Sequence, residues 1–332
     1  MERVERKMRP EITKAQDIIW DKFIDEGYAA KQAPIEEVTK SQEFIKTANQ
    51  CREIDTSYLR GYLNLDIALD IDVDKDILLA KDGISQVVEH GNTKKYYRRA
   101  SADLLGNIVL DHRLDDQNAS QVLIHDLSHE FFHALAIREK RLAISPDRST
   151  PTNIAIDYLV KAGYETHRGA EGELMVGFNE AVTERMTREA IEDYADSIPE
   201  DERLRILNHP ANDGYTRERI VLNKIIAHAS KTLQPDNPYA AELFWKDIAR
   251  GVFLGTKMHL RGIEKAYGKG SLRILAAMHP HDPKQKSEKN NFKDDIFVRY
   301  FSPETIHAER DILSAQILNM KDVDEKGGNL IT

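Results

Sequence analysis

The chain has very little cysteine, since Cys51 is the only one in 332 residues. A single thiol excludes an internal disulfide framework and agrees with a reducing compartment. Long hydrophobic runs are also missing, and no segment approaches the about 20 apolar residues of a membrane-spanning helix. The segment from Met1 to Arg6 is charged and contains no apolar signal core. We therefore expect a cytoplasmic protein with no membrane partner.

Basic charge is in deficit as well, because 47 Lys and Arg face 56 Asp and Glu, for a net charge of −9. This balance argues against general nucleic-acid binding, which needs a basic surface. Hydrophobic residues make up 41% and charged residues 31%, as in a globular chain with a sizeable core. We expect an N-terminal helical extension over residues 1–55, a main domain over 56–320 and a flexible tail over 321–332.

The hydrophobic period changes along the chain and predicts most of the elements. An apolar stripe from Ile12 to Ile24 indicates a helix that docks on the core, and a second helical segment runs from Ile35 to Arg52. Strict alternation from Tyr62 to Asp74 predicts a half-buried strand. Further strands are expected at 76–80, 94–100 and 107–110, a loop with one helix at 152–162 over 145–172, and helices at 216–233, 240–267, 271–277 and 304–318.

The stretch from Gln121 to Leu142 reads as a buried central helix. No Gly or Pro interrupts it, and Asn118 or Ser120 can cap its start. Arg138, Lys140 and Arg141 lie where they would face the negative end of the helix dipole. The helix is polar on one face only. Its other side carries the apolar residues Leu123, Ile124, Leu127, Phe131, Ala134 and Leu135.

That polar face contains His129-Glu130-Phe131-Phe132-His133, an H-E-x-x-H sequence. Residues four apart share a helix face, so His129 and His133 can offer two imidazole nitrogens to one metal ion. Glu130 then lies beside the open coordination position, as in zinc hydrolysis. Chance produces this pattern in roughly a few chains per hundred, so the motif needs support from elsewhere in the sequence.

Support comes from Gly177-Phe178-Asn179-Glu180-Ala181-Val182-Thr183-Glu184. A catalytic zinc takes three protein ligands, so the two histidines need a third. If Asn179 caps a helix that runs to about Tyr194, Glu180 lies in its first turn and Glu184 one turn later. Glu180 is then the candidate third ligand, and Glu184 can accept the outer N–H of a ligand histidine, with His129 the preferred partner. The alternative is that both are solvated helix charges.

These two segments resemble the signature of the gluzincin metallopeptidases, H-E-x-x-H followed by a helix that carries N-E-x-x-x-[DE]. The resemblance covers Gln121 to about Tyr194. It implies His129, His133 and Glu180 as ligands of one Zn²⁺ ion and Glu130 as general base. It also implies that Glu184 accepts a hydrogen bond from a ligand histidine. It also implies peptide or protein substrates and an α+β zincin-like fold. In that fold a small mixed sheet lies in a lobe that extends to about residue 142, followed by a mainly helical C-terminal lobe. An edge strand of the sheet, expected at Gly106 to Leu110, would hold the substrate backbone.

Two departures from this signature are visible. The gap of 47 positions from His133 to Glu180 is longer than in thermolysin, so an insertion must fold between the two helices. Phe132 stands where a smaller residue is common, so it either narrows the cleft or packs.

Several alternatives remain open. His125, one turn before His129, is a candidate for a second metal site, although a hydrogen-bonded or packed histidine is preferred. Tyr215 is the preferred donor to a developing oxyanion, with His228 and His209 as rivals and core packing as the alternative. A binding or regulatory protein on the same scaffold, or a zinc hydrolase of a non-peptide substrate, would carry the same motifs.

Overall fold

The computed structural model describes most of the chain from residue 39 onward. The predicted helix from Ile12 to Ile24 lies outside the described residues, as do Asn118, His209 and Gly106. The described ranges are 39–67, 71–74, 76–80, 86–89, 92–95, 100–102, 108–111, 120–146, 154–168, 172–207, 215–256, 259–280, 292 and 295–327.

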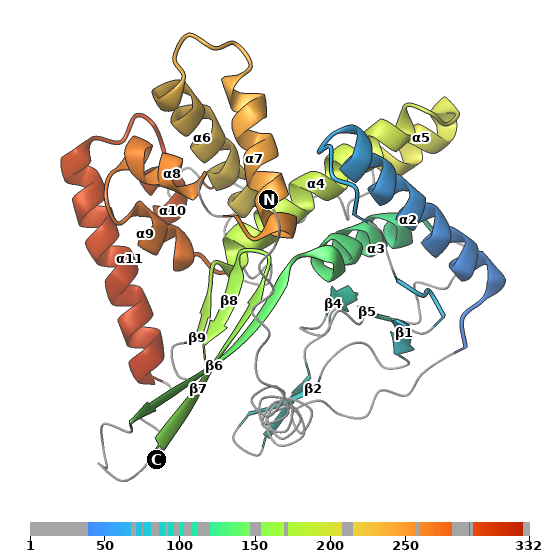
Figure 1. The fold of residues 1–332 in the computed structure, drawn as a ribbon, viewed down its shortest axis with the longest axis horizontal. Coiled ribbons are helices and arrows are strands. Elements are labelled where there is room, and N and C mark those ends of the chain that lie inside the picture. The colour runs from blue at the N-terminus through green and yellow to red at the C-terminus, as the bar shows by residue number, and fades with distance from the viewer. Residues whose placement is uncertain are drawn as a thin grey trace, which may run out of the picture.

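The fold is a helix-rich mixture of α-helices and small β-sheets, so the predicted α+β class is confirmed at that level (Figure 1). The strands precede and follow the motif helix α3, and helices make up most of the chain after Val176. The helices are α2 (Gln42–Gly61), α3 (Ser120–Leu135), α4 (Val176–Ala195), α5 (Glu200–Leu207), α6 (Thr216–Leu233), α7 (Ala240–Leu254), α8 (Leu260–Tyr267), α9 (Ser271–Ala276), α10 (Ile296–Tyr300) and α11 (His307–Gly327).

Helix α3 lies between two hydrophobic cores, which is why apolar residues cover so much of it. Leu123, Leu127 and Phe131 join a core formed with α2 and the first sheet. Phe132 instead belongs to the larger core around α4, α6 and α7, where it is fully buried against Tyr58 and Phe253. Of the two alternatives given for Phe132, narrowing a cleft or packing, the side chain therefore packs in the core.

The predicted strand from Tyr62 to Asp74 is wrong, because no described residue in this range is in a strand. Leu63, Leu65, Ile71 and Val73 are buried, as the alternation requires, but the described backbone is irregular. Asn64 has a left-handed φ of 51°, and the Asp72 carboxylate accepts the Asp74 N–H at 3.0 Å. Such side-chain bonds to nearby backbone groups replace the bonds of a sheet.

The first sheet has the strand order β1-β5-β4, with β1 (Ile77–Ala80) parallel to β5 (Ile108–Asp111) and β4 (Ala100–Ala102) antiparallel to it. The prediction that Gly106 to Leu110 forms the edge is therefore wrong, because β5 is central in this sheet. Among the described strands of this sheet, β1 and β4 lie at the two edges. A separate hairpin pairs β2 (Gln86–Glu89) with β3 (Asn92–Lys95).

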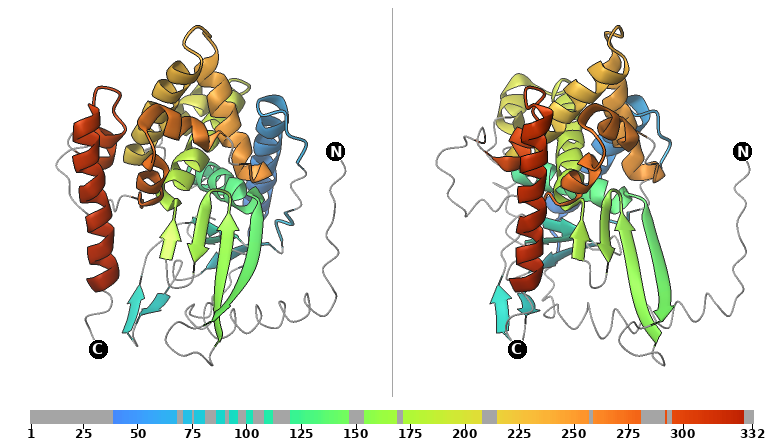
Figure 2. Two further views of the ribbon diagram at one scale, coloured as in Figure 1. Left: turned by 60° about the vertical axis from the view of Figure 1, so that its left-hand side comes forward. Right: turned by 90° about the vertical axis from the view of Figure 1, so that its left-hand side faces the viewer.

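The insertion between the two motifs forms a second, antiparallel sheet of order β6-β7-β8-β9. Its strands are β6 (Arg138–Pro146), β7 (Ile154–Ala162), β8 (Glu165–Arg168) and β9 (Gly172–Leu174). The long β6–β7 hairpin extends away from α3 and α4, in the same general direction as α11 (Figures 1 and 2). The helix predicted at 152–162 is thus wrong, and the motif helix ends at Leu135 instead of Leu142. Arg138, Lys140 and Arg141 belong to β6.

The C-terminal helices follow the predictions more closely. Helix α6 has the predicted bounds, and the helix expected over 240–267 is divided into α7 and α8. Gly255, with a φ of 67°, ends α7 in the left-handed conformation that glycine adopts without strain. Helix α2 crosses the domain boundary expected at residue 55, and α11 continues past residue 321.

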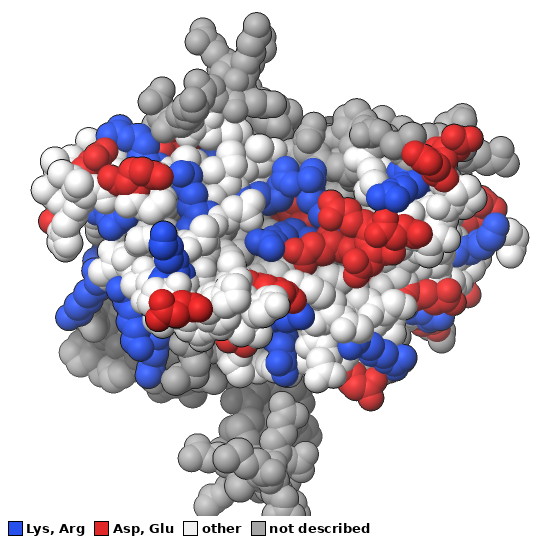
Figure 3. Space-filling view, turned by 90° about the horizontal axis from the view of Figure 1, so that it is seen from above, with Lys and Arg blue, Asp and Glu red and all other residues white. Residues whose placement is uncertain are grey.

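None of the helices in the described part of the chain combines the length and apolar content that crossing a bilayer requires. Figure 3 shows Lys and Arg scattered over the face seen from above and a contiguous group of Asp and Glu right of its centre. The expectation of no nucleic-acid partner stays a prediction.

Candidate metal centre

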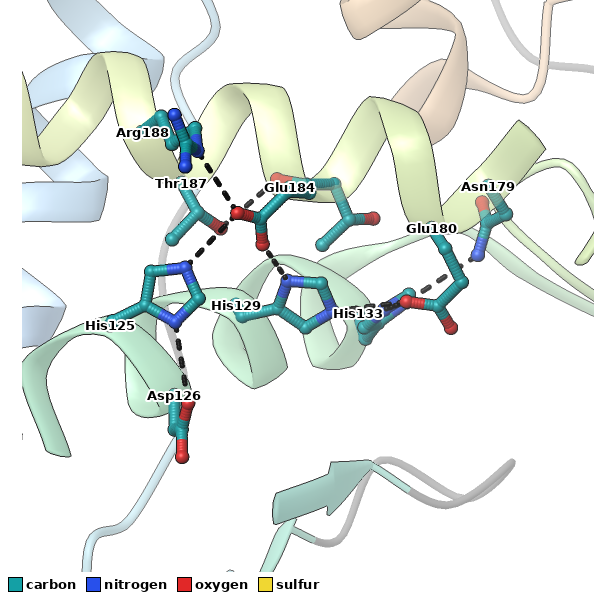
Figure 4. A network of polar contacts seen from close by, with 10 residues as sticks. His125, Asp126, His129, His133, Asn179, Glu180, Glu184, Thr187 and Arg188 are labelled. Carbon is teal, nitrogen blue, oxygen red and sulfur yellow. Dashed lines mark hydrogen bonds and ion pairs between the residues drawn. The ribbon is translucent and has the colours of Figure 1, made fainter. Parts of the chain in front are cut away.

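Helices α3 and α4 pack side by side and present the two sequence motifs to each other (Figure 4). His129 and His133 project from α3 on one face, as their spacing predicts. Glu180 and Glu184 project from the facing side of α4, one turn apart. The packing of these two helices therefore brings together residues that are separated by the whole inserted sheet.

Three ligand-type atoms meet between these helices. Glu180 Oε2 lies 3.1 Å from His129 Nε2 and 3.3 Å from His133 Nε2, and the two Nε2 atoms are 3.1 Å apart. A tetrahedral zinc ion with bonds of about 2.0–2.1 Å holds its ligand atoms about 3.3 Å apart. The group His129, His133 and Glu180 therefore can hold a metal ion, and its spacing fits one of zinc size.

The electrostatics of Glu180 suit a ligand. Burial opposes its ionisation, but the charges and hydrogen bonds of His133 and His129 hold the pKa of its carboxyl well below the usual range. Its side chain is 15% exposed. Glu180 is thus a carboxylate in the folded chain, which is the form that binds a cation.

The start of α4, and with it Glu180, is hydrogen-bonded to the last residue of α9 and to the segment that follows it. The Gly177 N–H donates to the Met278 carbonyl at 2.9 Å, and the Met175 N–H donates to the Ala276 carbonyl at 3.0 Å. A Cβ on Gly177 would lie only 2.6 Å from the Met278 oxygen. The close approach of two backbone segments explains why glycine begins the second motif.

Asn179 does not cap α4, because the helix begins at Val176 and Met175 is its N-cap. Its side-chain oxygen instead accepts the Tyr164 N–H at 3.1 Å, at the turn between β7 and β8. Its amide nitrogen lies 3.4 Å from His133 Nδ1. The correction places Glu180 in the second turn of α4 and makes Asn179 a link between the inserted sheet and His133.

Glu184 lies behind His129, where the sequence predicts it. Its Oε2 is 3.3 Å from His129 Nδ1, and its side chain is fully buried. Burial raises the pKa of this carboxyl, but hydrogen bonds with His125 and His129 outweigh burial and lower the pKa to about 2. A carboxylate at Nδ1 keeps the proton there and leaves the Nε2 lone pair for a metal.

Glu130 lies next to the three ligand-type residues without joining their group. Its Oε2 accepts the N–H of Ala102, in edge strand β4, at 2.5 Å. Burial raises the pKa of this carboxyl, although the nearby His129 and His133 oppose that shift. The contact connects the edge of the first sheet directly to the residue expected to be the base.

Tyr215 is brought to the same place by the start of α6. Its ring stacks on the His129 ring, with centroids 5.5 Å apart and planes 10° apart. Burial, followed by the charges of Glu180 and Glu130 and a hydrogen bond with Glu180, raises the pKa of the phenol well above its usual range. Tyr215 also has a left-handed φ of 51°, a strained conformation for a bulky residue and one that recurs at functional sites.

Neither rival donor is seen at this site in the described part of the chain. His228 packs edge-on against the Tyr267 ring, with centroids 4.8 Å apart, and His209 lies outside the described residues. His125 is hydrogen-bonded to Glu184 and Asp126, as preferred for it on sequence. Sequence reasoning missed the roles of Asn179, Ala102 and Arg188. For Arg188 the spacing of four from Glu184 was the available signal.

The fold and the site together define a helix-rich α+β protein in which two histidines and one glutamate form a group able to hold a metal ion. No family model, curated protein or solved structure matches this chain.

Proposed function

We propose that the protein is a zinc-dependent metallopeptidase of the gluzincin type. One observation carries the proposal: Glu180 Oε2 lies within 3.3 Å of the Nε2 atoms of both His129 and His133. The ligand types are those of catalytic zinc, with two histidines and one glutamate. The resemblance of the two motifs to gluzincins supports the same assignment and a zincin-like arrangement of the lobes.

A bound zinc ion supplies Lewis acidity, which polarises a carbonyl group and makes water a nucleophile at neutral pH. Glu130 accepts the proton of the attacking water and later delivers it to the leaving amine. The Ala102 N–H, 2.5 Å from Glu130 Oε2, orients the carboxylate for this transfer. The acidic side chain thus serves as base and acid without being a ligand.

Tyr215 would stabilise the negative charge that develops on the carbonyl oxygen. Its raised pKa keeps the phenol protonated, so it is an O–H donor beside Glu180 and His129. Donors that are already in position when charge develops are among the largest contributions to catalysis. Strand β4 would pair with an extended substrate backbone, because it lies at the edge of its sheet and contacts Glu130.

The decisive experiment incubates the purified chain with casein and a peptide library, with and without EDTA. The proposal expects cleavage that EDTA abolishes, that zinc restores and that Glu130→Gln lacks. Hydrolysis of small esters without any peptide cleavage would favour a non-peptide hydrolase. Zinc binding with no hydrolysis of any substrate would favour a binding or regulatory protein.

A further inference from the structure

The carboxylate of Glu184 contacts two histidines, His125 and His129, that lie on the same face of α3. His125 lies one turn before His129, and the two rings are 6.3 Å apart with planes inclined by 26°. His125 Nε2 is 3.2 Å from Glu184 Oε1, while the other oxygen, Oε2, is 3.3 Å from His129 Nδ1. Figure 4 shows Glu184 between the two rings.

This sharing constrains Glu184 more than a single bond can. A glutamate side chain has three rotatable bonds, so a contact through Oε2 alone leaves the carboxylate plane free to turn. His125 holds Oε1 from α3, and Arg188 Nε holds the same oxygen from α4 at 3.1 Å. His125 is itself 6% exposed and contacts Asp126 Oδ1 at 3.3 Å through Nδ1. The carboxylate is thus fixed from both helices.

We propose that His125 is a positioning residue of the metal centre: through Glu184 it sets the orientation and tautomer of His129. The inference rests on the proposed function, since His129 needs a fixed lone pair only where it binds a metal. With Glu184 held in place, Nδ1 of His129 keeps its proton and Nε2 faces Glu180 and His133. His125 touches neither a substrate nor the ion in this assignment, so its effect must appear in metal binding as well as in turnover.

The test measures zinc affinity by competition with a chelating dye, together with the visible spectrum of the cobalt form. His125→Leu removes the donor at similar size, and His125→Gln keeps an N–H of similar reach. Partners behind ligand histidines change metal affinity by about 10–100-fold. We expect His125→Leu to weaken zinc binding about tenfold and alter the cobalt bands, and His125→Gln to remain within about threefold of the parent chain. His228→Leu, a half-buried histidine on α6, is the matched control and should change neither quantity.

A double-mutant cycle separates positioning from packing. If His125 acts through Glu184, His125→Leu should weaken zinc binding little further in a chain that already carries Glu184→Gln. Equal losses in both backgrounds, or equal losses from Leu and Gln at position 125, would overturn the inference. So would parental affinity and spectrum in a folded His125→Leu chain.

A measurement on the unaltered chain covers the case in which His125→Leu does not fold. Imidazole ¹⁵N NMR of the zinc form should show His125 protonated at Nε2 and His129 protonated at Nδ1. A His125 with unprotonated Nε2 cannot donate to Glu184 and contradicts the inference. Parental zinc binding without peptide cleavage would remove the proposed peptidase function and leave the positioning role intact, so the two failures are distinguishable.

Discussion

At the scale of single residues, the three acidic side chains of the site have different surroundings. Glu180 faces two imidazole nitrogens, Glu184 lies behind one of those rings, and Glu130 contacts a backbone N–H of the edge strand. The three carboxyls are chemically alike, so we expect their different environments to give them different roles.

The role of Glu130 makes a direct prediction. Glu130→Gln keeps the shape of the side chain but cannot accept a proton, so the variant should retain one zinc per chain and lose activity. Loss of a general base lowers turnover by roughly 10²–10⁴-fold. Zinc content by elemental analysis and kcat on a library-derived peptide are the two readouts. Near-parental kcat at full zinc occupancy would exclude Glu130 as the base.

Tyr215 allows a prediction that separates chemistry from binding. Tyr215→Phe retains the ring that stacks on His129 and removes only the hydroxyl. Because the lost bond forms mainly in the transition state, kcat should fall by roughly 10–10³-fold while KM and zinc content change little. A variant with raised KM and unchanged kcat would assign the hydroxyl to substrate binding instead.

At the scale of elements, the site depends on where α4 begins. Gly177→Ala places a Cβ 2.6 Å from the Met278 carbonyl oxygen, so α4 or the segment after α9 must move. Such overpacking typically destabilises a protein by about 1–3 kcal/mol, and it should also displace Glu180 and weaken zinc binding. Gly61→Ala is the matched control, because its Cβ meets nothing within 4 Å. Equal melting temperatures and zinc affinities for the two variants would contradict this account.

The elements also show what the sequence could predict. The spacing of four between His129 and His133 predicts one shared helix face, which α3 confirms, and the periodicity of α6 predicts its bounds. The sequence does not predict the end of α3, since no Gly or Pro lies between Gln121 and Arg138. The chain turns where the Ile137 N–H donates to the Val252 carbonyl, more than a hundred positions away. Long-range bonds of this kind override local propensity.

Strand β7 was misread for a different reason. Its β-branched and aromatic residues at Ile154, Ile156, Tyr158 and Val160 alternate with a period of two, which was the signal for a strand. Asn179 was assigned as a cap from its residue type alone. Its bond to the Tyr164 N–H depends on the docking of the inserted sheet, which no local pattern reveals.

At the scale of the whole molecule, the inserted sheet is joined to the helical lobe at Tyr164. The Tyr164 hydroxyl donates to the Ile248 carbonyl at 2.7 Å and contacts His259 Nε2. Burial lowers the pKa of His259 to about 4, against an ordinary value of 6.5. The sheet, α7 and the start of α8 therefore meet around a histidine that is neutral in the folded chain.

This arrangement predicts a pH dependence of stability. Between pH 6.5 and about 4 the unfolded chain binds a proton at His259 that the folded chain does not. The contribution of neutral His259 to the free energy of unfolding is therefore complete above pH 6.5 and is lost as the pH falls toward 4. A shift of this size corresponds to about 3 kcal/mol. Denaturant unfolding curves, measured in EDTA, should show that the free energy of unfolding falls less between pH 6.5 and 4 for His259→Gln than for the parent chain. The exposed His307→Gln is the control, and parallel pH profiles for all three chains would refute the prediction.

The most direct test of the central claim is an anomalous difference map of the zinc-loaded protein, collected at the zinc absorption edge. We expect one peak per chain, about 2.0–2.1 Å from Nε2 of both His129 and His133 and about 2.0–2.2 Å from a carboxylate oxygen of Glu180. No peak between α3 and α4, or a peak to which Glu180 contributes no ligand, would contradict the assignment.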